Sequence, residues 1–530
     1  MNWKLPTLAV AFWIVVWPSL SWPALAADIK AKPSNYRNLL PKLKPGDTLK
    51  LAPGKYAPLA ISNLNGEPDA WITIAGPTSG QPALIAGEAG SNTIEVVNSS
   101  FLAIQNLRID SRGISGAFGI SAKGGRRNLT HDIRIEGNTL VGQNADQQTD
   151  GISTKTPTWG WIIRNNQIIG AGTGIYLGNS DGTQPFVHGL IENNLIKNTI
   201  GYNMEIKDQI SIPPVPGMPT EPASTIIRNN VFVKDDSPSP DGDRPNLLVG
   251  AFPNLGVGSL NLYEIYGNLF VHNPREALFQ GSGRISLHDN IFVDGPHDYP
   301  AVVLTRQNFP LKLAYVYNNT VYTTQRGIYF GSQALDSDLV IGNLVFGSSP
   351  ISGSITRQAD NLTASVTGAT DYVSSPSFQL GSMDFYPRPR KCHGPAIDLS
   401  PFQTHTAFNL DFNGISKSQS QGAIVFRGAG AGANRGWRLQ AAIKPSPAAT
   451  AAPPPSRTNS IDKSLSKAGR LDQVEIGSTT GTTGSAASAP CLDCEPSNRM
   501  DGCCPLPSNP DAASLLLWQS AARAEPAPAQ

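Results

Sequence analysis

The stretch NMEIKDQ, residues 203–209, holds the densest group of chemically useful side chains in this sequence: Glu205, Lys207 and Asp208. If the stretch is a β-strand, Glu205 and Lys207 project from the same face, because side chains alternate with a period of two. A carboxylate beside an amine can move protons, provided that partial burial or a nearby positive charge lets the lysine lose its own proton. A surface ion pair is the alternative interpretation.

A further carboxylate, Asp150, lies in QTDGIST, residues 148–154. Together with Glu205 it would supply the two carboxylates that polysaccharide hydrolysis requires. The Asp-Gly pair is also ordinary turn chemistry. A turn without a chemical role is therefore the alternative for Asp150.

A repeat with a variable period must position these candidates. Each copy has an asparagine preceded by Gly, Asn or Asp, the residue types that best tolerate positive φ. An aliphatic residue lies three positions before the asparagine, and an apolar residue lies two positions after it. The eight asparagines are Asn138, Asn166, Asn194, Asn230, Asn268, Asn290, Asn319 and Asn343, and Asn106 belongs to an imperfect earlier copy.

Each copy predicts a short strand, a one-residue left-handed corner and another strand. Stacked corners would let the asparagine amides hydrogen-bond along the stack, as in asparagine ladders. The copies are 22 to 38 residues apart, which fits a coil of fixed minimum length with loops inserted between its strands. A β-propeller needs four antiparallel strands per repeat, and these segments are too short for that. The sequence therefore predicts an all-β fold, a parallel β-solenoid.

The asparagine corners and the stretch KPGDTLKLAPGKYAPLAISN (44–63) resemble right-handed parallel β-helix proteins of the pectate-lyase-like group, including chondroitinase B and related alginate lyases. The segment 411–431 resembles the closing strand of such proteins. The resemblance covers roughly residues 36–438 and implies a single-stranded right-handed solenoid, which we place at 27–439. It also implies a protein that binds or degrades polysaccharide, as a lyase on uronate-containing chains. A hydrolase and a non-catalytic glycan-binding protein are the alternatives.

In the chondroitinase B-like lyases, a strand carries acidic calcium ligands and a lysine base. The resemblance therefore implies that Lys207 is the base, with Glu205 beside it, and that Glu205 and Asp208 are calcium ligands. These lyases also use an arginine, which Arg275 or Arg306 would have to supply here. Calcium would neutralise the substrate carboxylate and make the neighbouring proton more acidic.

Proteins of this fold work on an outer groove where side chains of successive turns align. If Met204 points inward, Glu205 points outward, and the same alternation places Tyr176, Phe279 and Tyr329 on the outer face. These three rings would offer flat faces to sugars, and Lys155 would attract an anionic chain. An ordinary solvated face, on which the aromatic rings cover their neighbours, is the alternative.

The first 26 residues predict a secretory signal peptide, with Lys4, an apolar run and the cleavage motif Ala24-Leu25-Ala26. An uncleaved membrane anchor is the alternative. We expect an exported protein, periplasmic or secreted, with no membrane span after the signal is removed and with a monomeric state. Lys and Arg number 41 against 40 Asp and Glu, which argues against a nucleic-acid partner. Residues 440–530 are of low complexity and predict a disordered tail.

Overall fold

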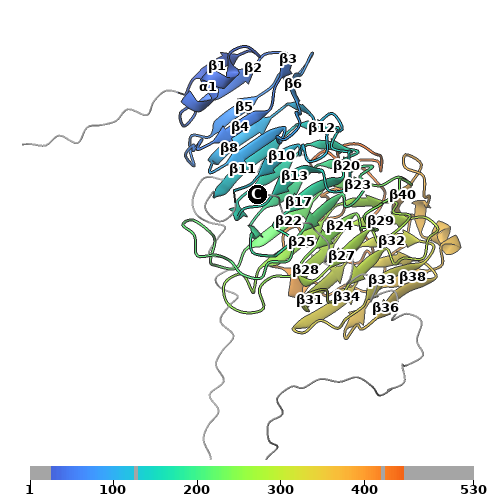
Figure 1. Ribbon diagram of the computed structural model, residues 1–530. Coiled ribbons are helices and arrows are strands. Elements are labelled where there is room, and N and C mark those ends of the chain that lie inside the picture. The colour runs from blue at the N-terminus through green and yellow to red at the C-terminus, as the bar shows by residue number, and fades with distance from the viewer. Residues whose placement is uncertain (1–25, 125–128, 419–423, 447–530) are drawn as a thin grey trace, which may run out of the picture. The chain divides into compact units, whose positions relative to one another are not determined.

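The computed structural model describes residues 26–124, 129–418 and 424–446. In this part the chain winds into a coil whose strands pair in three parallel sheets, here called A, B and C, of 15, 12 and 11 strands. Figure 1 shows successive turns stacked from β1, in blue, to β36 and β38, in yellow. Each full turn, or rung, gives one strand to A, then B, then C. The right-handed parallel β-helix predicted from the sequence is confirmed.

Sheet A follows the corner that ends each strand of sheet C. Its strands in spatial order are β1 (Asp28–Ala31), β2 (Thr48–Leu51), β5 (Ile72–Ala75), β8 (Ser100–Gln105), β11 (Thr130–Glu136), β15 (Ile162–Arg164), β19 (Leu190–Glu192), β22 (Ser224–Arg228), β25 (Leu262–Tyr266), β28 (Gly283–His288), β31 (Leu311–Tyr317), β34 (Ser337–Ile341) and β37 (Gln358–Ala359). Off this path, β14 (Thr158–Trp159) pairs with β11 and β18 (Phe186–Val187) pairs with β14.

Sheet B follows the asparagine corner. Its strands are β3 (Gly54–Tyr56), β6 (Ala83–Ala86), β9 (Arg108–Asp110), β12 (Thr139–Val141), β16 (Gln167–Ile169), β20 (Leu195–Lys197), β23 (Val231–Val233), β26 (Leu269–Val271), β29 (Ile291–Asp294), β32 (Thr320–Thr323), β35 (Leu344–Phe346) and β38 (Leu362–Ala364).

Sheet C carries the candidate site. Its strands are β4 (Leu59–Ser62), β7 (Ile94–Val97), β10 (Ile120–Ala122), β13 (Asp150–Thr154), β17 (Thr173–Leu177), β21 (Met204–Ile206), β24 (Leu247–Val249), β27 (Phe279–Gly281), β30 (Val302–Leu304), β33 (Arg326–Phe330) and β36 (Ser349–Gly353).

The interior of the coil is filled by rows of apolar side chains that repeat from rung to rung. Ile135, Ile163 and Ile191 pair in register on sheet A and are fully buried. On sheet B, Phe270 stacks between Phe232 and Phe292, at centroid distances of 4.9 and 4.6 Å. These β-branched and aromatic types suit strands that are buried on their inner face. At the start of the coil, α1 (Tyr36–Leu39) and η1 (Leu40–Lys42) add Tyr36 and Leu40 to the same core.

The predicted asparagine ladder is present at the corner between sheets A and B. Asn194 Nδ2 donates to Asn230 Oδ1 at 2.9 Å, and the Asn194 backbone N–H donates to the same oxygen at 3.0 Å. Asn194 Nδ2 also donates to the Ile163 carbonyl of the previous rung at 2.8 Å. The pattern repeats from Asn138 to Asn343, and each of the eight asparagines is buried. Each amide is therefore satisfied without water.

The residue before each ladder asparagine has the positive φ that its type predicts, from 51° at Asp289 to 67° at Gly342. Two details differ from the repeat as it was predicted from the sequence. Asn106 itself occupies the left-handed position, with φ 55°, so Leu107 takes the place of the ladder asparagine in that rung. The ladder also extends one rung further, because Asn343 Nδ2 donates to Asn361 Oδ1 at 3.0 Å.

After β38 the chain runs back over the outside of the coil. η3 (Thr367–Asp371) and the hairpin of β39 (Val373–Ser375) and β40 (Asp384–Pro387) pack on outward apolar residues of sheet B, such as Val271 and Val293. Further on, Ile397 and Phe402, which ends η4 (Ser400–Phe402), pack on Tyr317 and Ile341 of sheet A.

The predicted closing strand at 411–431 is wrong. Its described residues form isolated bridges outside the coil, such as Leu410 with Ser416. They lie against the corner residues, where Lys417 Nζ donates to Asp289 Oδ1 at 2.8 Å. The predicted domain end at Leu439 is also too early, because Lys444 is buried and binds Gly267 O at 2.7 Å. The amphipathic pattern that signals a strand cannot show whether that segment pairs in the coil or lies across it.

Two predictions concern residues outside the described ranges. These are the signal peptide, apart from Ala26, and the tail from residue 447 onward. Among the helices within those ranges, none combines the length and the apolar composition that crossing a bilayer requires.

Candidate functional site

The outer face of sheet C is the face where chemically active side chains gather. The described contacts of the C-terminal segment fall on sheets A and B. On sheet C, strand register places one outward side chain per rung in a single row. From β7 to β36 this row reads Glu95, Ser121, Ser153, Tyr176, Glu205, Leu248, Gln280, Val303, Tyr329 and Ser352.

Tyr176 lies between two lysines that come from the rungs on either side. Lys155 Nζ and Lys207 Nζ are each 5.1 Å from the centroid of the Tyr176 ring. Lys155 Nζ also lies 5.5 Å from the Phe118 ring centroid. Ammonium groups at these distances are attracted by the ring quadrupole. Lys155, Tyr176 and Lys207 therefore lie on one face, as the alternation predicts. Tyr176 is only 8% exposed, however, so its ring offers no open flat face to a sugar.

Glu205 fixes the position of Lys207. Lys207 Nζ lies 2.9 Å from Glu205 Oε1, and the two side chains are 25% and 2% exposed. They share one face of β21 and its extension, as the alternation predicts. The alternative of a solvated surface ion pair does not describe a carboxylate that is this deeply buried.

Gly178 lies on the rung between the two lysines, at a position too crowded for a side chain. It follows β17 in register with the position of Lys207 after β21, and its backbone N–H donates to Thr154 Oγ1 at 2.8 Å. Its φ is 91°, and a Cβ there would meet the Lys207 Cβ at 3.3 Å. A side chain would therefore be strained, and the rung between Lys155 and Lys207 carries none.

Asp150 belongs to the same group. It begins β13, is 3% exposed, and interacts electrostatically with Lys155, Glu205 and Lys207. Burial raises the pKa of Asp150 to about 8, and the negative charge of Glu205 adds to this rise. The positive charges of Lys155 and Lys207 and a hydrogen bond from Ser153 oppose the rise in part. The turn interpretation from sequence accounts for its place at the start of a strand, but not for its nearness to three charged groups.

The residues proposed to bind calcium are each engaged in other contacts. Asp208 Oδ1 accepts from the Ala251 N–H at 2.7 Å and Asp208 Oδ2 accepts from Asn308 Nδ2 at 2.9 Å, while Glu205 is paired with Lys207. Over the described ranges, no group of three or more His, Cys, Asp or Glu side chains is arranged to hold a metal ion. Hard cations such as calcium take six or more oxygen ligands. The donors around Glu205 and Asp208 do not fit a calcium site, and calcium stays a prediction from the resemblance alone.

Phe279 is a wrong prediction. It pairs with Leu247 and Val302, and its side chain is fully buried in the core. Leu278, just before β27, is buried in the same core, so two consecutive residues turn inward and Gln280 is the outward member. Strict alternation fails at this corner, and the sequence of two adjacent apolar residues does not show which of them begins the alternating strand.

Tyr329 points outward as predicted, but its ring is covered in part by Arg326, whose guanidinium carbon is 4.7 Å from the ring centroid. His288 ends β28 of sheet A. It is fully buried between Tyr266 and Tyr317, with centroid distances of 4.8 and 4.6 Å, because the C-terminal segment covers this face of sheet A.

Sequence reasoning did not include Tyr202, which lies beside Glu205. Burial raises the pKa of Tyr202, and Glu205 adds to the effect, while Arg244 opposes it. The Arg244 guanidinium carbon lies 5.7 Å from the Tyr202 ring centroid. Tyr202 lies two residues before β21, in the corner that leads into the strand of Glu205. This position in the sequence was the only sign that Tyr202 belongs to the site. Long insertions at 207–223, 234–246 and 250–261 follow the strands of the same rungs.

Comparison with known proteins gives distant likenesses in structure. No family model matches the chain, and no curated protein matches its sequence. A PL6 family alginate lyase, AlyGC, is 16% identical with a TM-score of 0.40, and the match covers 64% of this chain and 51% of that one. This chain therefore spans about half the length of that enzyme.

Two more solved structures are similar at the same level. The PL6 family polysaccharide lyase from Pseudopedobacter saltans is 12% identical with a TM-score of 0.40, over 64% of this chain and 93% of that one. The A-module of a mannuronan C-5 epimerase from Azotobacter vinelandii is 14% identical with a TM-score of 0.36, over 60% and 91%. Likenesses this distant do not decide an activity, which must come from the side chains of this chain.

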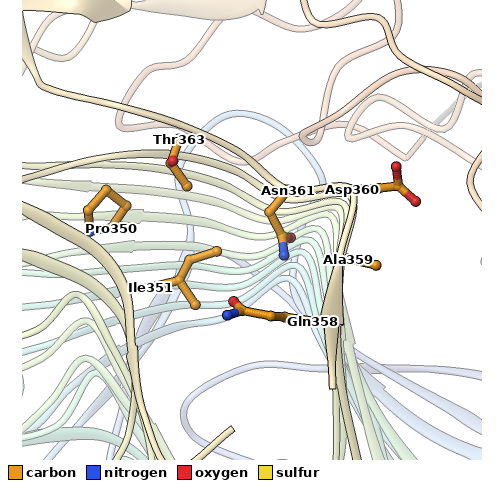
Figure 2. Close-up of a pocket in the computed structure, with 7 residues that line it drawn as sticks. All are labelled: Pro350, Ile351, Gln358, Ala359, Asp360, Asn361 and Thr363. Carbon is orange, nitrogen blue, oxygen red and sulfur yellow. The ribbon is translucent and has the colours of Figure 1, made fainter. Parts of the chain in front are cut away.

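A hollow of about 370 Å3 lies elsewhere, at the last rung of the coil. Figure 2 shows Ile351, Gln358 and Asn361 turned toward the coil interior, and Asp360 turned away from it. Asp360 is already paired with Arg427 at 2.9 Å. This hollow marks the place where the stack of rungs stops, and its lining lacks the lysines and buried carboxylates that meet on sheet C.

Proposed function

We propose that this is an exported protein that binds uronate-containing polysaccharide on the outer face of sheet C and cleaves it by β-elimination. The observation that supports this is the stack of Lys155, Tyr176 and Lys207 beside the buried Glu205. Rungs are about 4.8 Å apart, so the two lysines are separated by about 10 Å along the coil. Two ammonium groups on one outward face would attract a polymer that carries carboxylates.

In this scheme Lys155 binds the carboxylate of one uronate. Lys207 passes its proton to Glu205 Oε1, 2.9 Å away, and then acts as the neutral base that removes the proton next to the carboxylate. The Tyr176 hydroxyl gives its proton to the leaving glycosidic oxygen. One C–H and one C–O bond break, and a C=C bond forms in the sugar that carries the carboxylate. No step of the scheme requires a metal.

A second candidate is a hydrolase, and Asp150 is the observation that favours it. A carboxyl whose pKa is raised to about 8 could serve as the acid, while Glu205, paired with Lys207, could serve as the charged partner. Hydrolysis needs one carboxyl in each protonation state. The third candidate is a glycan-binding protein without turnover.

One screen separates the three candidates. The full chain is incubated with uronate and with neutral polysaccharides, and products are followed by ultraviolet absorbance and by reducing-end assay. An unsaturated product supports the lyase, and new reducing ends without absorbance support the hydrolase. Retention on a glycan without product leaves the binding protein. If no uronate polymer is retained or cleaved, the proposal is wrong.

A further inference from the structure

Asp150 has an unusual position for a carboxyl that has two lysines as neighbours. It is 3% exposed, and the charged groups that face it are Lys155, Glu205 and Lys207. In the described part of the chain, no ion pair joins Asp150 to either lysine: Lys207 Nζ is held by Glu205, and Lys155 Nζ lies over the rings of Phe118 and Tyr176.

A buried carboxylate without a cation at contact distance is costly, so such a carboxyl holds its proton instead. The direction and the cause of its pKa shift agree with this geometry. With Asp150 protonated, two ammonium groups and one carboxylate leave the group with one net positive charge. Ionisation of Asp150 would add a second carboxylate to the group and would bring its net charge to zero.

We propose that Asp150 is a positioning residue that decides whether Lys155 is available to an anionic ligand. Protonated Asp150 leaves the Lys155 ammonium on the aromatic rings, free to bind a carboxylate of the polymer. Ionised Asp150 cancels the net positive charge of the group, and the site releases the anion. This inference rests on the proposed function for the identity of the ligand, but not for the state of Asp150.

The test uses the full chain and a defined probe, galacturonate or mannuronate hexamers, with the dissociation constant measured by calorimetry at pH 6.5 and pH 9.5. We expect the wild type to bind about tenfold more weakly at pH 9.5, because a favourable net charge has been lost. Asp150→Asn should bind equally at both pH values, since an amide cannot ionise. The control Asp181→Asn changes an exposed aspartate in the turn after β17 and should keep the wild-type loss.

A second measurement needs no ligand. For an acid, a raised pKa in the folded state means that the folded protein keeps a proton that the unfolded chain has lost above about pH 3.9. The free energy of unfolding should therefore fall as pH rises from about 4 to about 8, and this part of the slope should vanish in Asp150→Asn. Asp150→Ser serves the same purpose if the amide disturbs folding.

The outcomes separate the two claims. Binding that is equally strong at both pH values overturns the inference and leaves the proposed function standing. An Asp150→Asn variant that keeps the wild-type pH dependence, in binding or in stability, also overturns it. If the wild type binds neither hexamer at either pH, the proposed function is wrong and the role in ligand binding is wrong with it. A stability slope that disappears in Asp150→Asn would then still establish the protonated carboxyl.

Discussion

Lys444 Nζ donates to Asn229 Oδ1 at 3.0 Å, across a separation of 215 residues in the sequence. Asn229 is one of the left-handed corner residues, with φ 56°, and Lys444 also binds the Gly267 carbonyl of the next corner. The end of the described chain thus reaches back to the middle of the coil. Burial lowers the pKa of Lys444, so this ammonium depends on the acceptors of these corners.

Truncation after Leu439 should destabilise the protein. It removes Lys444 and Ser446, whose hydroxyl donates to Asn193 Oδ1 at 3.0 Å, and leaves buried acceptors without donors. We expect a loss of about 1–3 kcal/mol, seen as a lower thermal midpoint. Truncation after Ser446 is the matched control and should leave the midpoint unchanged. Equal midpoints for the two truncations would contradict the role of Lys444.

Asn194→Ala should cost about 1–3 kcal/mol in the free energy of unfolding. Its side chain joins three rungs, because Oδ1 accepts from Asn166 and Nδ2 donates to Ile163 O and Asn230 Oδ1. Asn361→Ala, at the half-buried end of the same ladder, is the control and should cost less. Urea unfolding measures the free energy lost in each variant. Equal losses would contradict the larger contribution that we expect from the buried interior asparagine.

Lys207→Ala should lower turnover by about a hundredfold or more in whichever assay the polysaccharide screen gives, with folding unchanged. Lys155→Ala should instead raise KM, because its role is to bind the carboxylate. Lys197→Ala, on sheet B, is a control with the same change of charge. Turnover that survives Lys207→Ala would remove Lys207 from the mechanism and leave the Lys207–Glu205 pair a structural role.

Signal cleavage after Ala26 should create a new contact. The Ala27 N–H donates to Asp47 Oδ1 at 3.1 Å, and Asp47 is buried. Cleavage would turn this amide nitrogen into an ammonium beside a carboxylate, a charge-assisted bond of about 1.5–3 kcal/mol. Asp47→Asn should therefore lower the thermal midpoint of the cleaved chain more than that of the uncleaved chain. Equal effects, measured by calorimetry on both forms, would argue against this ion pair.

Glu276→Gln should make stability less dependent on pH. Burial raises the pKa of Glu276 to about 7, partly opposed by a hydrogen bond from the Ala277 N–H. The unfolded chain loses this proton near pH 4.3, so the folded state is stabilised below that pH relative to neutral pH, and stability falls between about 4.3 and 7. Thermal midpoints at pH 5 and pH 8 should lie closer together in the variant. Glu67→Gln, at an exposed position near the start of the coil, should not have this effect.

The corner motif carried enough information to predict the coil. Only Gly, Asn and Asp precede the ladder asparagines, and this restriction fixes a backbone conformation wherever it occurs. The site strand was predictable for a similar reason, since Met204 and Ile206 alternate with Glu205 and Lys207 without ambiguity. Phe279 failed because Leu278 and Phe279 are both apolar, so composition could not choose the register.

The course of the C-terminal segment could not be predicted either. Lys417 and Lys444 are buried through contacts with residues far away in sequence, and a single lysine in a polar stretch gives no sign of such partners. Asp150 was visible as a carboxylate, but its raised pKa comes chiefly from burial, and only the stacked rungs bring that burial and the neighbouring charges of Lys155, Glu205 and Lys207 together.

The ribosome synthesises Lys417 and Lys444 after the corner residues that these two lysines bind. Lys417 and Lys444 bind corners that lie 128 and 215 residues earlier in the sequence, so those rungs are synthesised long before the groups that fasten them. Until then the corners at Asn229, Gly267 and Asp289 lack their lysine donors, and their carbonyl and carboxylate oxygens remain open to water. The corners of the middle rungs therefore gain these donors only after Lys417 and Lys444 have been synthesised, and a chain interrupted before Lys417 would lack both of them.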